Sequence, residues 1–490
     1  MILREAHHEY QLLTREQMFL AATTLVFLTG LGLTKALPIL VPWLRSQLRF
    51  KPGVKGGGAI RIGSILLRDD TRLRQTHIVG ATGTGKSVLL EQLVFQDLAR
   101  GYGAVIIDPK GDRELYERVR GYCKLLGREE DLHLLSATYC EESVRWNPCR
   151  LGNVSELQSK FFNSAIYTEP HYAKACELGL LKAFKGLTSE MADGFTVSDL
   201  LIKLMEISQE EKDATIKGLF LDLYNLAEGE WREILCCGSK NRESTEISLL
   251  DITRKNEILF VDLPTESKSV QSTRMGRLLL QELMLISGLR KTFPNIRAGK
   301  PFSVYIDEFD AFATENFATF LNKGRSSGFM IHMAHQTLSD LEKVGKHFEG
   351  QVLGNTNVRF IFRQDDPVDA ERWSKFLGTQ KVTKKTHQAQ DGNLTGMTSN
   401  RETQEFKIHP DTIKELLVGE CIFSAKTERE LKKVRIPFLD KLNSKSRQFP
   451  VQRSATDHSP VDRRKSLDQL KDRFEIFLQA NEIVKGDEPA

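Results

Sequence analysis

The chain has 490 residues, enough for two or three domains, and its 40% hydrophobic and 27% charged residues are typical of a globular protein. A net charge of +4 excludes neither a basic groove for nucleic acid nor an ordinary mixed surface. Seven cysteines occur without a CxxC pair, and no histidine pair has zinc-finger spacing. This usage predicts a reducing compartment and argues against a structural metal site.

The first predicted element is a membrane anchor in residues 1–50. Residues 18–34 carry no charge, and this length of about 17 residues is the short limit for a membrane-spanning helix. The apolar pattern continues past Lys35, and residues 45–55 contain basic but no acidic side chains, which predicts a cytosolic C-terminal side. We expect a transmembrane helix over residues 18–44. A hairpin turning near Lys35 and a buried core helix are the alternatives.

Alternating strand and helix patterns follow the anchor. Several predicted strands are continuous apolar runs, as expected for strands covered on both faces. The pattern predicts a doubly wound, mainly parallel α/β sheet. We assign residues 51–152 and 247–440 to this domain. The predicted strands are residues 76–80, 103–108, 257–263, 302–308, 329–335, 357–362 and 419–425.

Two segments depart from this alternation. Residues 153–246 have helical spacing without a convincing strand, which predicts an all-α subdomain inserted into the α/β domain. Residues 441–490 begin with a polar, basic stretch that predicts a disordered linker. A short helix follows, and it either packs back on the domain or binds a partner. Its apolar face consists of Leu467, Leu470, Phe474 and Phe477.

Residues 80–87 read GATGTGKS and match the phosphate-binding pattern GxxxxGK[ST] between a predicted strand and a predicted helix. Glycines let successive backbone N–H groups face the phosphates of a nucleotide, and the positive end of the following helix favours the same charge. We expect Lys86 to reach the β- and γ-phosphates and Ser87 to bind Mg²⁺ directly. The predicted nucleotide-binding residues of this loop are Gly80, Ala81, Thr82, Gly83, Thr84, Gly85, Lys86 and Ser87.

A second acidic motif follows the strand 302–308, where the sequence reads FSVYIDE. An acid at the carboxyl end of a strand lies in the crevice where nucleotides bind in such sheets. We expect Asp307 to bind Mg²⁺ through its waters and Glu308 to polarise the attacking water. Because no NKxD sequence is present to read a guanine base, the preferred nucleotide is ATP.

Further candidates surround the strand 329–335. Arg325 is predicted on a glycine-flanked turn before this strand, where it could act as an arginine finger across a subunit boundary. Gln336 follows the strand and could contact the γ-phosphate or its water. Arg359 is the rival candidate for the finger. Asp108, in the sequence DPKGD, is compatible with a place near the nucleotide or with simple turn chemistry.

The order of these motifs resembles that of the TraD/TraG-type coupling proteins of bacterial conjugation and type IV secretion, relatives of the FtsK/HerA ATPases. The phosphate-binding loop, DPKGD, a helical insert, YIDEFDAF, GRSSGF and AHQT occur in that order, and the resemblance covers residues 55–435. It implies a RecA-like P-loop NTPase domain. The positions that the family uses for nucleotide chemistry fall on Lys86, Ser87, Asp307, Glu308, Arg325 and Gln336.

The resemblance also implies a function and partners. It predicts a ring, usually hexameric, at the bacterial inner membrane with its ATPase domain in the cytoplasm. Such a ring uses ATP and Mg²⁺ to deliver a relaxase-bound DNA strand or an effector protein to a secretion channel, with mostly sequence-independent DNA contacts. The inserted helices match the subdomain that recognises the relaxosome or cargo. A DNA translocase for chromosome or plasmid handling and a non-hydrolysing substrate receptor are the alternatives.

This sequence departs from the family pattern at both ends. Family members commonly have two membrane helices around a small periplasmic domain, and the single interrupted segment here leaves no room for that domain. The C-terminal tail is also short compared with the tails that bind partners in longer members.

Overall fold

The computed structural model describes residues 58–437, apart from 168, 192–193, 212–215, 236–245, 267–268, 298 and 391–392. The predicted membrane segment and the predicted C-terminal helix lie outside the described residues. Among the residues that are described, no helix combines the length and the apolar character needed to cross a membrane.

A nine-stranded mixed sheet forms the centre of the molecule, in the order β15-β14-β11-β3-β10-β9-β4-β8-β5. Neighbouring strands from β11 to β5 pair in parallel, whereas β14 pairs antiparallel with both β11 and β15. The strands are β3 (Thr76–Val79), β4 (Gly103–Asp108), β5 (Leu132–Ser136), β8 (Ile258–Asp262), β9 (Phe302–Ile306), β10 (Phe329–His335), β11 (Val358–Ile361), β14 (Glu420–Ala425) and β15 (Glu430–Arg435).

Apolar side chains leave both faces of this sheet, as the continuous apolar runs predict. Along β4, Ile106 packs in one core cluster, while Val105 and Ile107 pack in another. Successive side chains of a strand point to opposite faces, so one strand contributes to both clusters. The mainly parallel α/β sheet expected from the sequence is therefore present, with an antiparallel edge added by β14 and β15.

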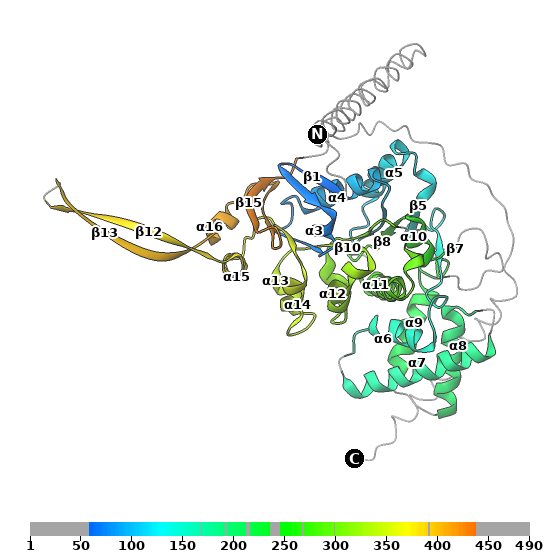
Figure 1. Cartoon of the computed structure of the whole chain (residues 1–490). Coiled ribbons are helices and arrows are strands. Elements are labelled where there is room, and N and C mark those ends of the chain that lie inside the picture. Colours follow the sequence, from blue (N-terminus) through cyan, green and yellow to red (C-terminus); the bar gives the residue numbers. More distant parts are fainter. Residues whose placement is uncertain are drawn as a thin grey trace, which may run out of the picture.

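Helices cover the two faces. The cluster around Ile106 includes side chains of α4 and α5, and the opposite cluster includes α11, α12 and the helices α6 to α9. Figure 1 shows α6 to α9 gathered at one end of the molecule beside α11. The helices are α3 (Asp69–Arg72), α4 (Lys86–Ala99), α5 (Arg113–Leu125), α6 (Val154–Asn163), α7 (Pro170–Glu190), α8 (Val197–Glu211), α9 (Lys217–Glu228), α10 (Leu249–Lys255), α11 (Ser269–Thr292), α12 (Phe317–Ser327), α13 (Leu338–Glu342), α14 (Phe348–Asn355), α15 (Pro367–Leu377) and α16 (Pro410–Lys414).

Helices α6 to α9 form a helical block between β6 and β7, and the chain enters and leaves this block at one place. The short strand β6 (Arg145–Trp146) precedes α6, and it pairs in parallel with β7 (Glu246–Ile247), which precedes α10. Trp146 also donates from Nε1 to Glu282 Oε1 of α11 over 3.1 Å, and Lys160 of α6 pairs with the same carboxylate at 2.9 Å. These buried contacts hold the helical block against α11.

Some elements were absent from the sequence-based expectation. The strands β5 and β15 were not predicted, and neither was the long hairpin of β12 (Thr379–Gln390) and β13 (Asn393–Phe406). Figure 1 shows this hairpin projecting from the side of the molecule opposite the helical block. Its sequence is polar on both faces, so it lacks the alternation that identifies a half-buried strand. A small hairpin, β1 (Ala59–Ile62) and β2 (Ile65–Arg68), precedes α3.

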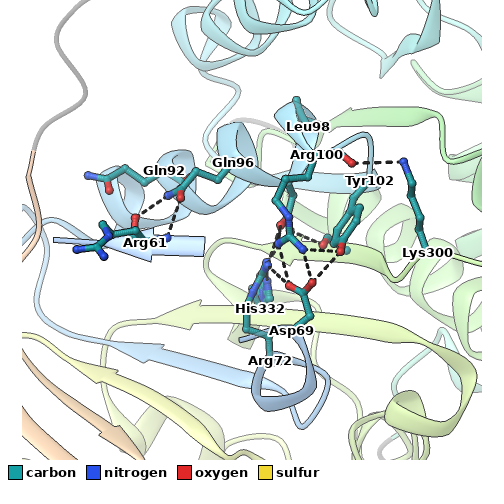
Figure 2. Close-up of polar contacts among 12 residues, drawn as sticks. Arg61, Asp69, Arg72, Gln92, Gln96, Leu98, Arg100, Tyr102, Lys300 and His332 are labelled. Carbon is teal, nitrogen blue, oxygen red and sulfur yellow. Dashed lines mark hydrogen bonds and ion pairs between the residues drawn. The ribbon is translucent and has the colours of Figure 1, made fainter. Parts of the chain in front are cut away.

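A buried polar network joins α3 and α4 to strands β9 and β10, and Figure 2 shows the part around Asp69, Arg72 and His332. Arg72 donates to both carboxylate oxygens of Asp97, at 2.7 and 2.5 Å, and Tyr305 donates to Asp97 Oδ2 at 2.5 Å. Burial alone would raise the pKa of Asp97, but the Arg72 guanidinium and the hydrogen bonds from Ser303 and Tyr305 together lower it. Burial, with Arg72 nearby, lowers the pKa of His332, so His332 is neutral and accepts from Arg72 Nη2 at 2.7 Å.

Candidate nucleotide-binding site

The loop 80–87 follows β3 and leads into α4, which begins at Lys86. Gly83 and Gly85 have φ values of +75° and +115°, a region that L side chains rarely adopt. At Gly80, an added Cβ would lie 2.5 Å from the Cβ of Phe362, so a side chain has no room there. Gly83 and Gly85 are thus required by their positive φ values, and Gly80 is required by the lack of space beside Phe362.

Lys86 folds back into this loop. Its Nζ donates to the carbonyl oxygens of Gly80 at 2.5 Å and Ala81 at 3.1 Å, and the residue is only 8% exposed. Burial lowers the pKa of Lys86, and the nearby Asp307 carboxylate opposes that effect. The ammonium group is therefore held against two carbonyl oxygens of the loop, and its contact with phosphates stays a prediction of the motif.

The structure brings Ser87 and Asp307 together, although they are far apart in the sequence. Asp307 directly follows β9, and Ser87 lies in the first turn of α4. Ser87 Oγ donates to Asp307 Oδ2 over 3.2 Å. A hydroxyl and a carboxylate oxygen are ligands that suit Mg²⁺, which usually keeps several waters and nucleotide phosphate oxygens as its other ligands. These two residues fit a magnesium–nucleotide complex.

Glu308 lies beside this pair in a strained backbone conformation. Its φ of +41° and ψ of +52° are in the left-handed region, and it begins a short 3-10 turn at Phe309–Ala311. A non-glycine residue held there costs on the order of 1–3 kcal/mol. Burial, with the Asp307 charge beside it, raises the pKa of Glu308. The carboxylate thus follows Asp307 directly in the chain, and its affinity for protons is increased.

Gln336 also reaches the phosphate-binding loop. Strand β10 lies between β3 and β9, as the sequence analysis expected for the strand beside Asp307. Gln336 follows β10, and its Oε1 accepts from Thr82 Oγ1 over 3.1 Å. Thr82 and Gln336 are both exposed to solvent, so the amide lies where a bound γ-phosphate or its water is accessible.

The two finger candidates occupy different environments. Arg325 lies in the last turn of α12, which is closed by Gly328 in the left-handed region, rather than on the predicted turn. It is exposed and precedes β10, so it lies about 20 Å, the length of that strand, from its own phosphate-binding loop. Arg359 is 1% exposed and donates to the carbonyls of Leu353 and Thr356. The structure therefore does not support Arg359 as a finger.

Two residues of the DPKGD motif lie at the site, of which Lys110 was not identified from the sequence and Asp108 was left open. Lys110 of the DPKGD motif extends its Nζ to 2.6 Å from Asp307 Oδ2 and 3.0 Å from Ser87 Oγ. Asp108, which the sequence left open, is buried at the end of β4, and burial raises its pKa to about 7. The DPKGD motif contains both residues, but placing them beside Asp307 requires the knowledge that β4 pairs with β9.

The C-terminal part of the domain also contacts the phosphate-binding loop. Gly419 N donates to Thr84 O over 2.9 Å, and its Cα lies 3.4 Å from the position of a Cβ on Gly85. The adjacent Leu417 and Val418 are 67% and 53% exposed. Because this contact joins residues more than 300 positions apart, local sequence patterns could not predict it.

Two protein families match this chain. The model described as "Type IV secretion-system coupling protein DNA-binding domain" matches residues 59–217. The model described as "TraM recognition site of TraD and TraG" matches residues 301–417. The first match includes the phosphate-binding loop and Lys110, and the second includes Asp307, Glu308 and Gln336.

Among curated proteins, the chain is similar to the type 4 coupling protein DotL of Legionella pneumophila subsp. pneumophila. The two are 22% identical over 408 residues, which cover 64% of this chain and 50% of DotL. The chain thus spans about half the length of the curated relative that it matches.

Solved structures share the fold. The unbound conjugative coupling protein TrwBΔN70 superposes with a TM-score of 0.61 at 18% identity, over 78% of this chain and 89% of that one. TrwB in complex with ADP and Mg²⁺ gives 0.60 at 18% identity, over 79% and 91%. VirB4 of Thermoanaerobacter pseudethanolicus gives 0.53 at 16% identity, over 79% and 98%. One coupling-protein model matches residues 59–217, which include α6 to α8, and the other matches residues 301–417, so the chain matches type IV secretion coupling proteins of the TrwB/TraD/TraG family over both of these segments.

Proposed function

We propose that this protein is an ATP-driven motor that couples a relaxase-bound DNA strand or a protein substrate to a type IV secretion channel. The observation that carries the proposal is the convergence of Lys86, Ser87, Asp307, Glu308 and Gln336 at one edge of the sheet. A protein that used nucleotide only for assembly would not need Glu308 beside Ser87 and Asp307, because no water would have to be activated. The matches to coupling-protein models and the TrwB-like fold support the same conclusion.

Each residue has a chemical task in this proposal. The N–H groups of the loop and Lys86 bind the phosphates, while Ser87 and Asp307 hold Mg²⁺, which neutralises charge on the phosphates when bound. Glu308 accepts a hydrogen bond from the attacking water and orients it. Gln336, linked to Thr82, contacts the terminal phosphate or that water.

Arg325 acts across a subunit boundary in the proposed ring. Its exposure and its distance from the phosphate-binding loop of its own chain support a role in a neighbouring subunit. An arginine finger of this kind accelerates phosphoryl transfer by about 10³–10⁵. We propose a homo-oligomeric closed ring, because each finger then completes the next site around the ring. The resemblance to coupling proteins implies that this ring is a hexamer.

The membrane anchor remains part of the proposal. Residues 18–44 would hold the ring at the bacterial inner membrane, with residues 51–440 in the cytoplasm. Within the chain we propose a division into a P-loop ATPase domain, 51–152 and 247–440, and an inserted all-α subdomain, 153–246. A disordered basic linker and a short helix would follow over residues 441–490.

A cavity of about 730 Å³ supports a role for the inserted helices in binding a protein substrate. It lies between α7, α9 and α11, and Arg274 and Arg277 line it together with Asp222. Among the described residues, the buried Nε atoms of both arginines have no hydrogen-bond partner. Burial lowers the pKa of Arg277 to about 10, and the Arg274 charge adds to that effect. Such a donor-rich cavity suits a carboxylate of a protein segment.

The apolar mouth of the cavity favours a protein over DNA. Ile166 is 68% exposed and Val270 is 70% exposed, and both line the cavity. We therefore expect Arg277→Met to weaken binding of the relaxase–DNA complex at least tenfold while DNA binding alone is unchanged. Arg254→Met, which removes an exposed arginine of α10, is the matched control. If Arg277→Met binds the relaxase–DNA complex as tightly as Arg254→Met does, the proposed role of this cavity is refuted.

The test of the function uses the full-length protein in detergent. ATP hydrolysis should require Mg²⁺ and increase with single- or double-stranded DNA, and the DNA affinity should fall steeply with salt because the contacts are to phosphates. Lys86→Ala should abolish hydrolysis and conjugative transfer and leave the protein at the membrane. Normal transfer by Lys86→Ala would refute the motor. DNA-stimulated hydrolysis without any effect on transfer would instead favour chromosome or plasmid handling.

A further inference from the structure

Lys110 occupies the position between the two residues that are expected to hold Mg²⁺. Its Nζ lies 2.6 Å from Asp307 Oδ2 and 3.0 Å from Ser87 Oγ, and these two oxygens lie 3.2 Å apart. The ammonium and the two oxygens thus form a closed triangle of short contacts. A Mg²⁺ ion at about 2.0–2.1 Å from Ser87 Oγ would reach Asp307 through one of its waters, and that water would take the position of the Lys110 ammonium. The metal ion with its water and the ammonium therefore cannot share this place.

We propose that Lys110 is a built-in competitor of Mg²⁺ at this site. Its ammonium neutralises Asp307 and keeps Ser87 in place while nucleotide is absent, and it leaves when Mg²⁺ arrives with the nucleotide. Lys110 thereby excludes free metal ions and makes metal binding depend on the phosphates. This inference rests on the proposed function, and it goes further by assigning a task to the DPKGD motif.

The charges around Lys110 explain why a resident cation is needed. Asp307 and Glu308 face the ammonium group from the turn after β9, and Asp108 faces it from the end of β4. Lys86 is a second cation that faces the same carboxylates. Burying several carboxylates with too few cations is unfavourable, because like charges repel strongly where water is excluded. Lys110 supplies the missing positive charge.

Hydrogen bonds hold the backbone of the loop that carries Lys110, while the side chain of Lys110 is partly exposed to solvent. Asp108 O accepts from Leu263 N at 2.8 Å, and Pro109 O accepts from Thr265 N at 2.8 Å. Gly111 has a φ of +68°, and a Cβ there would lie 3.0 Å from Pro264 Cβ. In contrast, the Lys110 side chain is 40% exposed. A rotation about its side-chain bonds therefore opens the metal position without any change in the loop.

The same anchoring connects the exchange to the rest of the domain. The segment that holds the loop, residues 263–265, connects β8 to α11. Glu282 of α11 contacts Trp146 of β6 and Lys160 of α6. The loop of Lys110 is therefore joined to the inserted helices through α11.

The test measures metal binding without nucleotide. Mn²⁺ replaces Mg²⁺ as the probe, and free Mn²⁺ is followed by electron paramagnetic resonance on the full-length protein. Lys110→Met removes the charge and keeps most of the stem, so it should bind Mn²⁺ at least tenfold more tightly than the wild type. Lys110→Arg keeps a cation and should resemble the wild type. Lys375→Met, which removes an exposed lysine of α15, is the matched control.

The outcomes separate this inference from the proposed function. Adding Asp307→Asn to Lys110→Met should abolish the gain, because the gained site uses that carboxylate. Equal Mn²⁺ affinity of the wild type and Lys110→Met would overturn the inference, and so would undetectable Mn²⁺ binding by both. Thermal unfolding of each variant verifies that it is folded. Binding of a fluorescent ADP analogue is measured separately, and its absence from the wild type would refute nucleotide binding rather than the exchange.

Discussion

Thr82 in the phosphate-binding loop donates a hydrogen bond to Gln336 at the end of β10, over 3.1 Å. This contact joins two adjacent strands of the sheet, since β10 and β3 pair in parallel. Gln336 is therefore in direct contact with the loop that is expected to hold phosphates. Because Gln336 lies just before α13, this contact also links the phosphate-binding loop to the start of that helix.

Gln336→Ala should separate nucleotide binding from hydrolysis. Loss of the amide leaves Lys86 and the loop N–H groups in place, so the Kd for Mg²⁺·ADP should change less than about threefold. The value of kcat for ATP should fall about 10- to 100-fold, because the amide no longer positions the water or the terminal phosphate. Gln351→Ala, at an exposed position of α14, should behave as wild type. A large loss of nucleotide affinity would contradict the assignment.

Glu308→Gln should retain Mg²⁺·ATP and hydrolyse it about 10²–10⁴ times more slowly, the usual contribution of a general base. Burial, with Asp307 beside it, raises the pKa of Glu308, so this carboxylate takes up a proton at a higher pH than an ordinary glutamate. Hydrolysis by the wild type should therefore fall as the pH is lowered through that raised pKa. The pH profile of kcat measures this directly. A profile with the same acidic limb in Glu308→Gln would show that another group titrates.

Arg325→Ala should abolish hydrolysis in a homogeneous oligomer. If the finger acts across a boundary, mixing with Lys86→Ala subunits should restore part of the activity, because a Lys86→Ala subunit supplies Arg325 to an intact site. The ATPase rate is measured as a function of the mixing ratio. Lys323→Ala, exposed on the same helix, is the control and should hydrolyse ATP normally. No recovery at any ratio would exclude a finger that acts in trans.

Asp97→Asn should destabilise the protein and leave the contacts of the nucleotide site unchanged. The change leaves Arg72 buried with a neutral partner, and breaking a buried ion pair from one side costs about 3–5 kcal/mol. The free energy of unfolding in urea measures this loss. Asp411→Asn, at an exposed ion pair with Lys414, should change it by less than about 1 kcal/mol.

The same carboxylate predicts a pH dependence of stability. Because the folded-state pKa of Asp97 is lowered, its contribution is fully present above the unfolded-state value and is lost as the pH falls through the folded-state value. The wild type should therefore lose more stability on acidification than Asp97→Asn. Parallel curves for the two proteins would contradict the role of the Arg72–Asp97 pair.

The predicted strands illustrate what local patterns can decide. The sheet strands β3, β4, β8, β9, β10, β11 and β14 lie within the predicted ranges, because continuous apolar runs have few alternatives to a doubly covered strand. β5 was missed because His133 interrupts its short apolar run. The β12–β13 hairpin was missed because its polar residues carry no periodicity. Antiparallel pairing of β14 depends on the path of the chain, which no local pattern reports.

The amino-acid sequence by itself determined the phosphate-binding loop, the acidic pair Asp307–Glu308 and the candidate Gln336, because each is a short motif at the end of an apolar strand. Only the tertiary structure decided that Lys110 meets Ser87 and Asp307, and that Arg359 is buried in its own chain while Arg325 is exposed. The physical reason is strand order. Which carboxyl ends are neighbours depends on how the strands pair across the sheet, and that pairing is a property of the whole domain.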